Sequence, residues 1–325
     1  MTKLAIAATA AVLSLATFGA ASAQVIAIAT TPAGSFTNSI GAAVAKVVVD
    51  HAKIRTTLMP QQSHGMEVVN EGSAELSLAT LSDVQQYVTG TVDWKERGPH
   101  PNIRIISRLV PIQTVGFVRK DSPIKTLADI KGKRISWGFG AQKAVQRVNE
   151  AQLAAVGLAE KDIQPVLAPN IVAAADDFIA GKTDVFWFAT GSAKVKQAAA
   201  SVGGIRALAI PTTPEAIAAM HKFVPGSYPT LLKPAPQLDG IIEPTMVMAY
   251  DVVLFTSAKM SEDAIYRIAK AVHDNKPEMA GVFRPMNGFE PGKMAINYED
   301  LQYHAGAVKY FKEIGQWPPQ KMPGS

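Results

Sequence analysis

The sequence predicts an α/β protein with two doubly wound domains that are joined by a double-crossing hinge. Short apolar segments typical of buried strands alternate with amphipathic helical segments along the whole chain. The apolar segment 103–119, which Pro111 interrupts, is too long for one strand, and 246–255 is a second long segment of this type. At both places we expect the chain to pass between domains. The 325 residues are enough for two domains of ordinary size.

The first 23 residues have the pattern of a cleavable secretion signal. Lys3 supplies a positive charge, an apolar run covers residues 4–20, and Ala21-Ser22-Ala23 is a small-residue cleavage site. The apolar run is short for a membrane span, so we exclude residues 1–23 from the fold and expect the mature chain to begin at Gln24. No later apolar run reaches the length of a span. We therefore expect a soluble protein of the periplasm.

The composition is that of a globular protein, with 48% hydrophobic and 18% charged residues. The chain has no cysteine, so it has neither disulfides nor a cysteine for a lipid anchor after the signal. Without Lys3 there are 31 Lys and Arg against 27 Asp and Glu, a net charge of +4. These charges are scattered along the chain, which argues against nucleic-acid binding. We expect a monomer.

The N-terminal part alternates strands and helices at the spacing of a parallel sheet that is covered on both faces. The expected elements are a strand at 25–30, a turn at 31–37, a helix from Asn38, a strand at 54–59, a short helix at 66–71 and a strand at 76–80. Residues 91–102 are polar and rich in Gly and Pro, which predicts a surface loop.

The middle of the chain centres on a strand, a glycine turn and a helix at residues 135–156. One face of this helix has Ala141, Ala144, Val145, Val148, Ala151 and Ala155, and Gly157 ends it. A glycine turn between a strand and a helix leaves the first helical N–H groups uncovered, and these groups have partial positive charge. We expect this turn to bind a carboxylate or a phosphate. In the alternative interpretation, Gly138 and Gly140 only form a tight turn.

The two halves of the chain resemble each other around two short segments, 72–80 and 181–190. In each segment a helix ends at glycine, an acidic residue follows three positions later, and an apolar strand ends in Ala-Thr. The acidic residues are Glu75 and Asp184. This similarity supports two domains that are built in the same way. Further elements expected in the second half are a strand at 164–167, a helix at 171–180 and strands at 184–189 and 205–210.

The C-terminal third begins with residues 211–243, which are rich in Pro and Gly and predict a long surface excursion. Segment 246–255 is then the return crossing, and helices near 261–274 and 301–314 pack on the first domain. We therefore expect a first domain of residues 24–112 and 254–325, a second domain of residues 113–253, and a cleft between them.

Four strand ends are expected to face this cleft, because ligands of parallel α/β sheets bind outside the carboxyl ends of the strands. Hydroxyls, amides, an aromatic ring and helix N-termini at these ends suit a small polar anion. The candidate ligand-binding residues are Ser35, Phe36, Thr37, Ser63, Gly140, Ala141, Gln142, Thr190, Gly191 and Ser192. Simpler roles stay open for several of them, since hydroxyls also cap helices and Phe36 suits a core.

The sequence contains no catalytic motif. The six histidines, at positions 51, 64, 100, 221, 273 and 304, show no metal-ligand spacing. Neither a Gly-x-Ser-x-Gly motif nor a phosphate-loop lysine motif is present. Gly138 and Gly140 resemble the start of a dinucleotide fingerprint, but Lys143 stands in place of its third glycine. We expect no enzymatic activity, no cofactor and no metal.

Several segments together resemble the TAXI-type solute receptors of TRAP transporters, over essentially the whole mature chain. The most specific segment is Tyr303-His304-Ala305-Gly306-Ala307-Val308-Lys309-Tyr310-Phe311-Lys312-Glu313-Ile314-Gly315. The others are Ala33-Gly34-Ser35-Phe36, Glu71-Gly72-Ser73-Ala74-Glu75-Leu76, the stretch from Leu127 to Ile135, and Val224-Pro225-Gly226-Ser227-Tyr228-Pro229.

This resemblance implies a type II periplasmic binding protein fold that closes like a flytrap and delivers its ligand to a sodium-coupled TRAP-type permease. It also implies a small carboxylate as ligand, such as a 2-oxo or dicarboxylic acid or a glutamate-like amino acid. The chain departs from the family at two places. Gly140-Ala141-Gln142 replaces a Gly-Ser-Gly-Thr type turn, and residues 62–67 replace a Ser-Val-Glu-Asn type stretch.

Two other functions fit the same fold. The first is a periplasmic sensing module that reports its ligand to a membrane histidine kinase. The second is an enzyme, such as the deaminase of tetrapyrrole synthesis, but that enzyme needs a cofactor-bearing cysteine and this chain has none.

Overall fold

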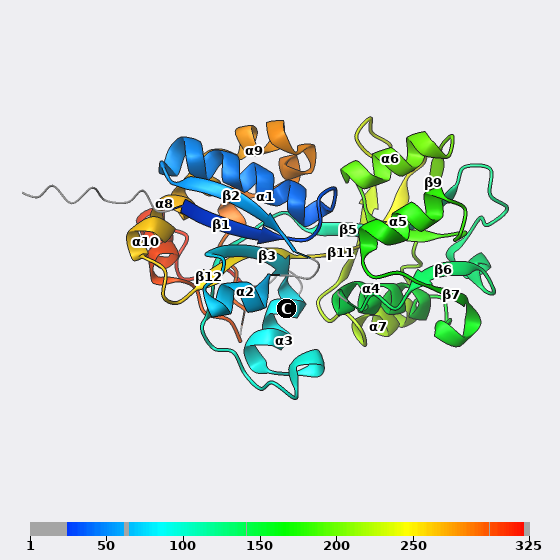
Figure 1. Cartoon of the computed structure of the whole chain (residues 1–325), viewed down its shortest axis with the longest axis horizontal. Coiled ribbons are helices and arrows are strands. Elements are labelled where there is room, and N and C mark those ends of the chain that lie inside the picture. The colour runs from blue at the N-terminus through cyan, green and yellow to red at the C-terminus, as the bar shows by residue number, and fades with distance from the viewer. Residues whose placement is uncertain (1–24, 62–64, 141, 299, 322–325) are drawn as a thin grey trace, which may run out of the picture.

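A computed structural model of the chain describes residues 25–61, 65–140, 142–298 and 300–321. It consists of two α/β lobes that lie side by side (Figure 1). The expected secretion signal and the candidate residues Ser63 and Ala141 lie outside the described residues. None of the helices in the described ranges combines the length and the apolarity needed to span a bilayer.

Lobe I contains a five-stranded sheet in the order β2-β1-β3-β12-β4. Its strands are β1 (Val25–Thr30), β2 (Arg55–Pro60), β3 (Leu76–Thr80), β4 (Ile103–Arg108) and β12 (Val252–Ser257). As the sequence predicts, β1 pairs in parallel with β2 and β3. β12 runs antiparallel to β3 and β4 because the chain returns from the other lobe at this point.

Helices cover both faces of the lobe I sheet, with α1 and α9 on one side and α2 and α3 on the other (Figure 1). The helices of lobe I are α1 (Phe36–Val47), α2 (Met66–Glu71), α3 (Leu81–Thr89), α8 (Glu262–Asp274), α9 (Lys276–Val282) and α10 (Ala305–Glu313). The apolar face of α1 is buried as the periodicity predicts, with Ile40, Val44 and Val47 all 0% exposed.

Lobe II combines antiparallel and parallel strand pairs. Its main sheet has the order β10-β11-β5-β8, with β9 also paired to β5, and every pair in it is antiparallel. Its strands are β5 (Ile112–Arg119), β8 (Phe186–Ala189), β9 (Ile205–Leu208), β10 (Tyr228–Leu232) and β11 (Thr245–Tyr250). β6 (Arg134–Trp137) and β7 (Gln164–Leu167) form a parallel pair, and a parallel bridge between Ile135 of β6 and Val185 connects this pair to the start of β8. The chain enters lobe II through β5, and β5 runs in the direction opposite to β8, β9 and β11.

The lobe II helices are α4 (Lys143–Ala154), α5 (Ile171–Ile179), α6 (Ala193–Ser201) and α7 (Pro214–His221). The prediction of an irregular excursion at 211–243 was wrong, because this segment contains α7 and β10. Thr213 caps α7 and Pro214 occupies its first position, where proline is favourable. β10 is an edge strand, and an edge strand tolerates Pro229. Both elements are too short to give a clear periodic pattern.

Two crossings connect the sheets, one through residues 109–111 between β4 and β5 and one at Asp251 between β11 and β12. The register places them together, since Tyr250 pairs with Ile112 in lobe II and Val252 pairs with Thr80 in lobe I. Both crossings therefore lie at the end of β3 that precedes α3. We propose that the domain boundaries fall at these crossings.

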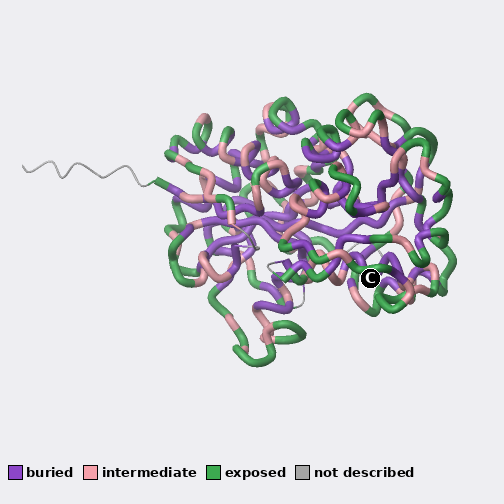
Figure 2. The backbone as a smooth tube through the Cα atoms, turned by 45° about the vertical axis from the view of Figure 1, so that its right-hand side comes forward, coloured by how far each residue is buried: buried purple, intermediate pink, exposed green. Residues whose placement is uncertain are grey.

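The core runs through both sheets, and the buried backbone crosses the middle of the molecule from one lobe to the other (Figure 2). The repeated acidic residue of the sequence has the same structural task in each lobe. The Glu75 carboxylate accepts a hydrogen bond from the Ala27 N–H of β1 at 2.7 Å, and the Asp184 carboxylate accepts one from the Arg134 N–H of β6 at 2.9 Å. In both lobes this residue anchors the first part of a parallel strand.

Candidate ligand-binding cleft

A cavity of about 70 Å³ lies between the lobes, and residues from both lobes line it. Lobe I contributes Thr31, Ser35, Phe36, Thr37, Thr80, Ser82 and Asp83. Lobe II contributes Ile112, Thr114, Gln142, Ala144, Val145, Arg147, Val148, Ile171, Phe188, Ala189, Val224 and Tyr250. Most of these residues follow a strand or belong to the first turns of a helix, so the strand ends of the two sheets meet at this cavity.

The candidate hydroxyls of the first turn lie in the cavity wall. Ser35 is the N-cap of α1, where its Oγ accepts a hydrogen bond from the Asn38 N–H at 3.2 Å. The Thr31 hydroxyl bonds the Ser35 hydroxyl at 2.5 Å and also bonds that of Thr37. Ser35 thus caps a helix and lines the cavity. Phe36 likewise has two roles, because it lines the cavity and packs edge-on against Phe283 at 5.1 Å.

Gln142 lines the cavity at the start of α4 and is 1% exposed. Its Oε1 accepts a hydrogen bond from the Ile171 N–H at 2.9 Å, and a backbone N–H can only donate, so the amide orientation is defined. Its Nε2 is buried and has no hydrogen-bond partner among the described residues. Gln142 therefore offers two N–H donors at the wall of the cavity.

The glycine turn before α4 depends on Gly138 more than on Gly140. Gly138 has a φ of +86°, a conformation that favours glycine, whereas Gly140 has no such φ, is exposed and does not line the cavity. Phe139 between them is buried against Ala168 and Ala174. Of Gly140 and Gln142, the two predicted residues of this turn that the structure describes, Gln142 is the one that lines the cavity.

The Thr190-Gly191-Ser192 turn lies beside the cavity, whose wall includes the preceding Ala189. Thr190 and Ser192 are buried, and the Ser192 hydroxyl donates to the Ala189 carbonyl at 2.8 Å. Gly191 has a φ of +72° and approaches Pro285 of lobe I. These three residues shape the turn and do not line the cavity.

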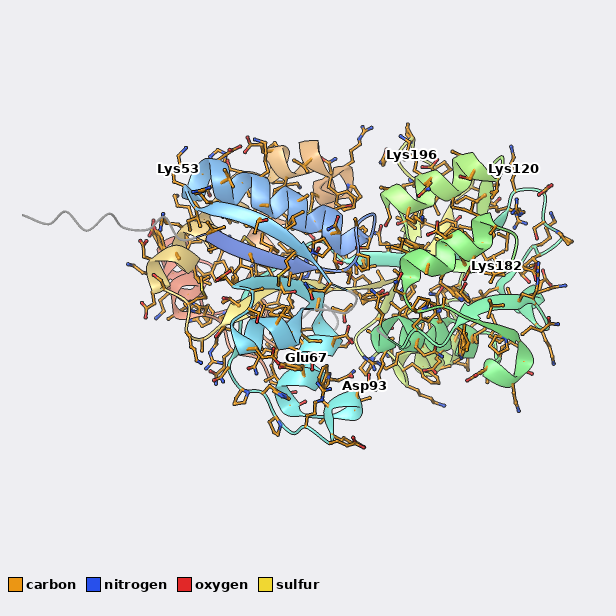
Figure 3. All side chains as sticks on the ribbon, in the orientation of Figure 1. Lys53, Glu67, Asp93, Lys120, Lys182 and Lys196 are labelled. Carbon is orange, nitrogen blue, oxygen red and sulfur yellow. The ribbon has the colours of Figure 1, made fainter. Side chains whose placement is uncertain are left out.

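The cavity also contains an ion pair that connects the lobes and that the sequence did not predict. Arg147 Nη2 of α4 donates to Asp83 Oδ1 of α3 at 2.7 Å, and the two side chains are 14% and 4% exposed. Arg147 Nη1 also bonds Asp93, which Figure 3 labels at the edge of lobe I that faces lobe II. Asp83 follows Thr80 by three positions at the N-terminus of α3. This capping pattern is the signal in the sequence that could have placed Asp83 at the start of a helix.

Buried polar groups extend from the cavity into lobe II. Burial, together with the negative charge of Asp83, raises the pKa of Tyr250 above its ordinary value, so the phenol stays neutral beside Thr114. Gln152 donates to the Thr114 hydroxyl at 3.5 Å, while its Oε1 and both amide atoms of Asn149 have no partner among the described residues. A buried amide without a hydrogen-bond partner costs free energy.

The wall of this cavity presents hydrogen-bonding groups, one ion pair and apolar side chains. No group of three or more His, Cys, Asp or Glu side chains within the described ranges is arranged to hold a metal ion.

Two α/β lobes with two crossings and a cavity between them define the type II periplasmic binding protein fold. The chain belongs to the NMT1-like family, whose model matches residues 28–315. A periplasmic transporter of solved structure has 17% sequence identity and a TM-score of 0.54, and the match covers 91% of this chain and 94% of that chain.

Two further solved structures resemble the chain more distantly. The alkanesulfonate-binding protein SsuA from Xanthomonas axonopodis pv. citri, bound to MOPS, has 15% identity and a TM-score of 0.47, with 90% of this chain and 91% of that chain covered. The zinc-bound ligand-binding component of an ABC-type import system from Staphylococcus aureus has 10% identity and a TM-score of 0.49, with 92% and 94% covered.

Proposed function

We propose that the protein is a periplasmic solute receptor, without catalytic activity, that captures a small carboxylate in the cleft between its lobes. The observation that supports this best is the cavity, because both lobes enclose it and its wall presents the Arg147 guanidinium and the Gln142 amide N–H groups. Charged and neutral N–H donors suit a carboxylate. A ligand that contacts both lobes binds the closed state best and therefore favours closure.

The resemblance to TAXI-type receptors supports a TRAP-type permease as the membrane partner. Its most specific segment, residues 303–315, contains α10 and its N-cap His304. The His304 Nδ1 accepts a hydrogen bond from the Gly306 N–H at 3.1 Å, and its Nε2 lies 3.1 Å from the Met260 carbonyl. This segment therefore stabilises lobe I. In this proposal the closed receptor delivers its ligand from the cleft to the permease.

A thermal-shift screen tests the proposal on the mature chain, residues 24–325, after ligand removal by unfolding and refolding. The screen contains 2-oxo acids, dicarboxylates and amino acids. At least one of them should raise the melting temperature, since a ligand at 100 times its Kd stabilises the folded state by about 2.7 kcal/mol. If no small carboxylate shifts the melting temperature, the proposal is wrong.

Arg147→Gln should weaken binding of the ligand that the screen identifies by about 10- to 150-fold, because hydrogen bonds to charged groups contribute about 1.5–3 kcal/mol. Arg134→Gln is the matched control in the same lobe, since Arg134 bonds Asp184 at 2.6 Å and does not line the cavity. Isothermal titration calorimetry of both variants compares the two effects. Equal affinities of Arg147→Gln and the unaltered protein would remove the guanidinium from the site.

A further inference from the structure

The charges in the cavity wall restrict the kind of ligand that the cleft accepts. Asp83 and Arg147 are the charged side chains among the described residues that line the cavity, and they balance each other. Asp93 adds a second carboxylate to Arg147 from outside the cavity wall, where its side chain is 26% exposed. A ligand with only negative charge would place a third carboxylate around one guanidinium. A ligand with one positive and one negative group keeps the balance, and like charges in a desolvated site are strongly unfavourable.

The two lobes offer opposite hydrogen-bonding partners to such a ligand. Lobe II presents donors, because Arg147 and the Nε2 of Gln142 both belong to the N-terminal part of α4. Lobe I presents the Asp83 carboxylate, whose Oδ2 accepts from the Thr80 hydroxyl at 2.7 Å and whose Oδ1 accepts from Arg147. Each carboxylate oxygen has two acceptor sites, so Asp83 can bind an ammonium group and keep its bond to Thr80.

The rest of the cavity wall is largely apolar and the cavity is small. Its volume of about 70 Å³ is far below that of a pocket for a drug-sized ligand, which is roughly 300–1,000 Å³. The larger apolar side chains that line it are Phe36, Ile112, Val145, Val148, Ile171, Phe188 and Val224. This part of the wall offers contact to a short hydrocarbon group and has no charge for a second carboxylate.

We propose that the cleft selects a zwitterionic amino acid with a small apolar side chain, with its ammonium group on Asp83 and its carboxylate at Arg147 and Gln142. This inference rests on the proposed function and narrows its ligand class. The ligand then connects an acceptor of lobe I with donors of lobe II. It replaces the direct Asp83–Arg147 contact, so the cleft closes around it without an unpaired charge.

The test is calorimetry on the ligand-free mature chain with sets of ligands that share a carbon skeleton. L-valine is compared with 3-methylbutanoate, which lacks the ammonium group, and with 2-methylpropan-1-amine, which lacks the carboxylate. L-alanine and L-leucine are tested with their corresponding acids and amines, and succinate and 2-oxoglutarate represent the dianions. We expect at least one of the three amino acids to bind 30-fold or more tightly than its acid, its amine and both dianions.

The outcomes separate this inference from the proposed function. If a carboxylic acid or a dianion binds as tightly as every amino acid or more tightly, the inference is overturned and the receptor function stands. If no small carboxylate of any kind binds, the proposed function is overturned together with the inference.

The variant Asp83→Asn tests whether Asp83 binds the ammonium group of the ligand. The amide has the same shape and can still accept the hydrogen bond from Thr80, so α3 should keep its N-terminal cap. We expect tenfold or greater loss of affinity for the amino acid, with unchanged or tighter binding of the matched carboxylic acid. Asp93→Asn is the control, because Asp93 contacts Arg147 but does not line the cavity, and it should shift both affinities equally. An equal loss for both ligands in Asp83→Asn would contradict the inference.

Discussion

At the scale of single residues, Gly306 shows how closely two helices of lobe I approach each other. A Cβ atom at this position would lie 2.2 Å from the Glu262 carbonyl oxygen and 2.9 Å from the Tyr266 nitrogen, so α10 rests on the backbone of α8. Gly306→Ala should therefore lower the free energy of unfolding by about 1–3 kcal/mol, because backbone atoms cannot move aside cheaply. Urea unfolding monitored by circular dichroism measures this change.

Gly281→Ala provides the matched control for that substitution. Gly281 lies within α9, and a Cβ atom there would meet no heavy atom within 4 Å. Alanine at this position should stabilise the protein by about 0.5–1 kcal/mol, since glycine loses more conformational freedom on folding. If both substitutions changed the stability in the same direction, the close approach of α8 and α10 would not be the cause.

At the scale of elements, the two crossings are tied together by a buried ion pair. Arg108 at the end of β4 donates to Asp251 through Nε at 2.7 Å and Nη2 at 2.8 Å, and both side chains are 8% exposed. Tyr228 of β10 donates to the same carboxylate at 3.3 Å. The pair therefore links the end of β4 to Asp251, the residue that separates β11 from β12. Both crossings between the lobes lie at this place.

Arg108→Met should lower the free energy of unfolding by about 3–5 kcal/mol, because it leaves the buried Asp251 carboxylate without its positively charged partner. Lys182→Met is the control, since Lys182 forms an exposed ion pair with Asp177 of α5 and such pairs contribute about 0–1 kcal/mol. Chemical unfolding of both variants gives the comparison. A loss below 1 kcal/mol for Arg108→Met would mean that the crossings do not depend on this pair.

At the scale of the whole molecule, contacts across the cleft connect the lobes in a closed arrangement. Arg147 of lobe II bonds Asp83 and Asp93 of lobe I, and Gly191 of lobe II approaches Pro285 of lobe I. A ligand in the cavity should take the place of the direct Asp83–Arg147 contact, bind both lobes and shift the population towards the closed state. We expect small-angle X-ray scattering to show a smaller radius of gyration at saturating ligand than without ligand.

A disulfide across the cleft provides a control for this closure. An ideal Cβ at Gly34 of lobe I lies 3.9 Å from the Lys194 Cβ of lobe II, within the Cβ–Cβ range of a disulfide, and the φ of +86° at Gly34 makes cysteine there strained. The native chain has no cysteine, so a Gly34→Cys/Lys194→Cys variant can form one intramolecular disulfide. The oxidised variant should have the same radius with and without ligand, and reduction should restore the difference. A native chain with equal radii at saturation would contradict hinge closure.

The sequence predicted the elements where local periodicity is strong. The apolar positions of α1, the strands β1 and β3, and the long segments at the two crossings are all visible in a window of a few residues. α7 and β10 were missed because short elements with proline give little periodicity. The sequence did not predict that β5 runs antiparallel to β8, β9 and β11, because the direction of β5 depends on how the chain enters from lobe I.

The order of residues along the chain is enough to place Ser35, Phe36, Thr37 and Gln142 after strands, and the cavity wall contains all four. Asp83 and Arg147, 64 residues apart, come together only because the folded lobes meet across the cleft. From the sequence, a charged residue within a helix is expected to be exposed to solvent. In the folded protein another lobe can bury it. Periodicity and capping are local properties of the chain, whereas the charge balance of a cavity arises from side chains that only docking of the two lobes brings together.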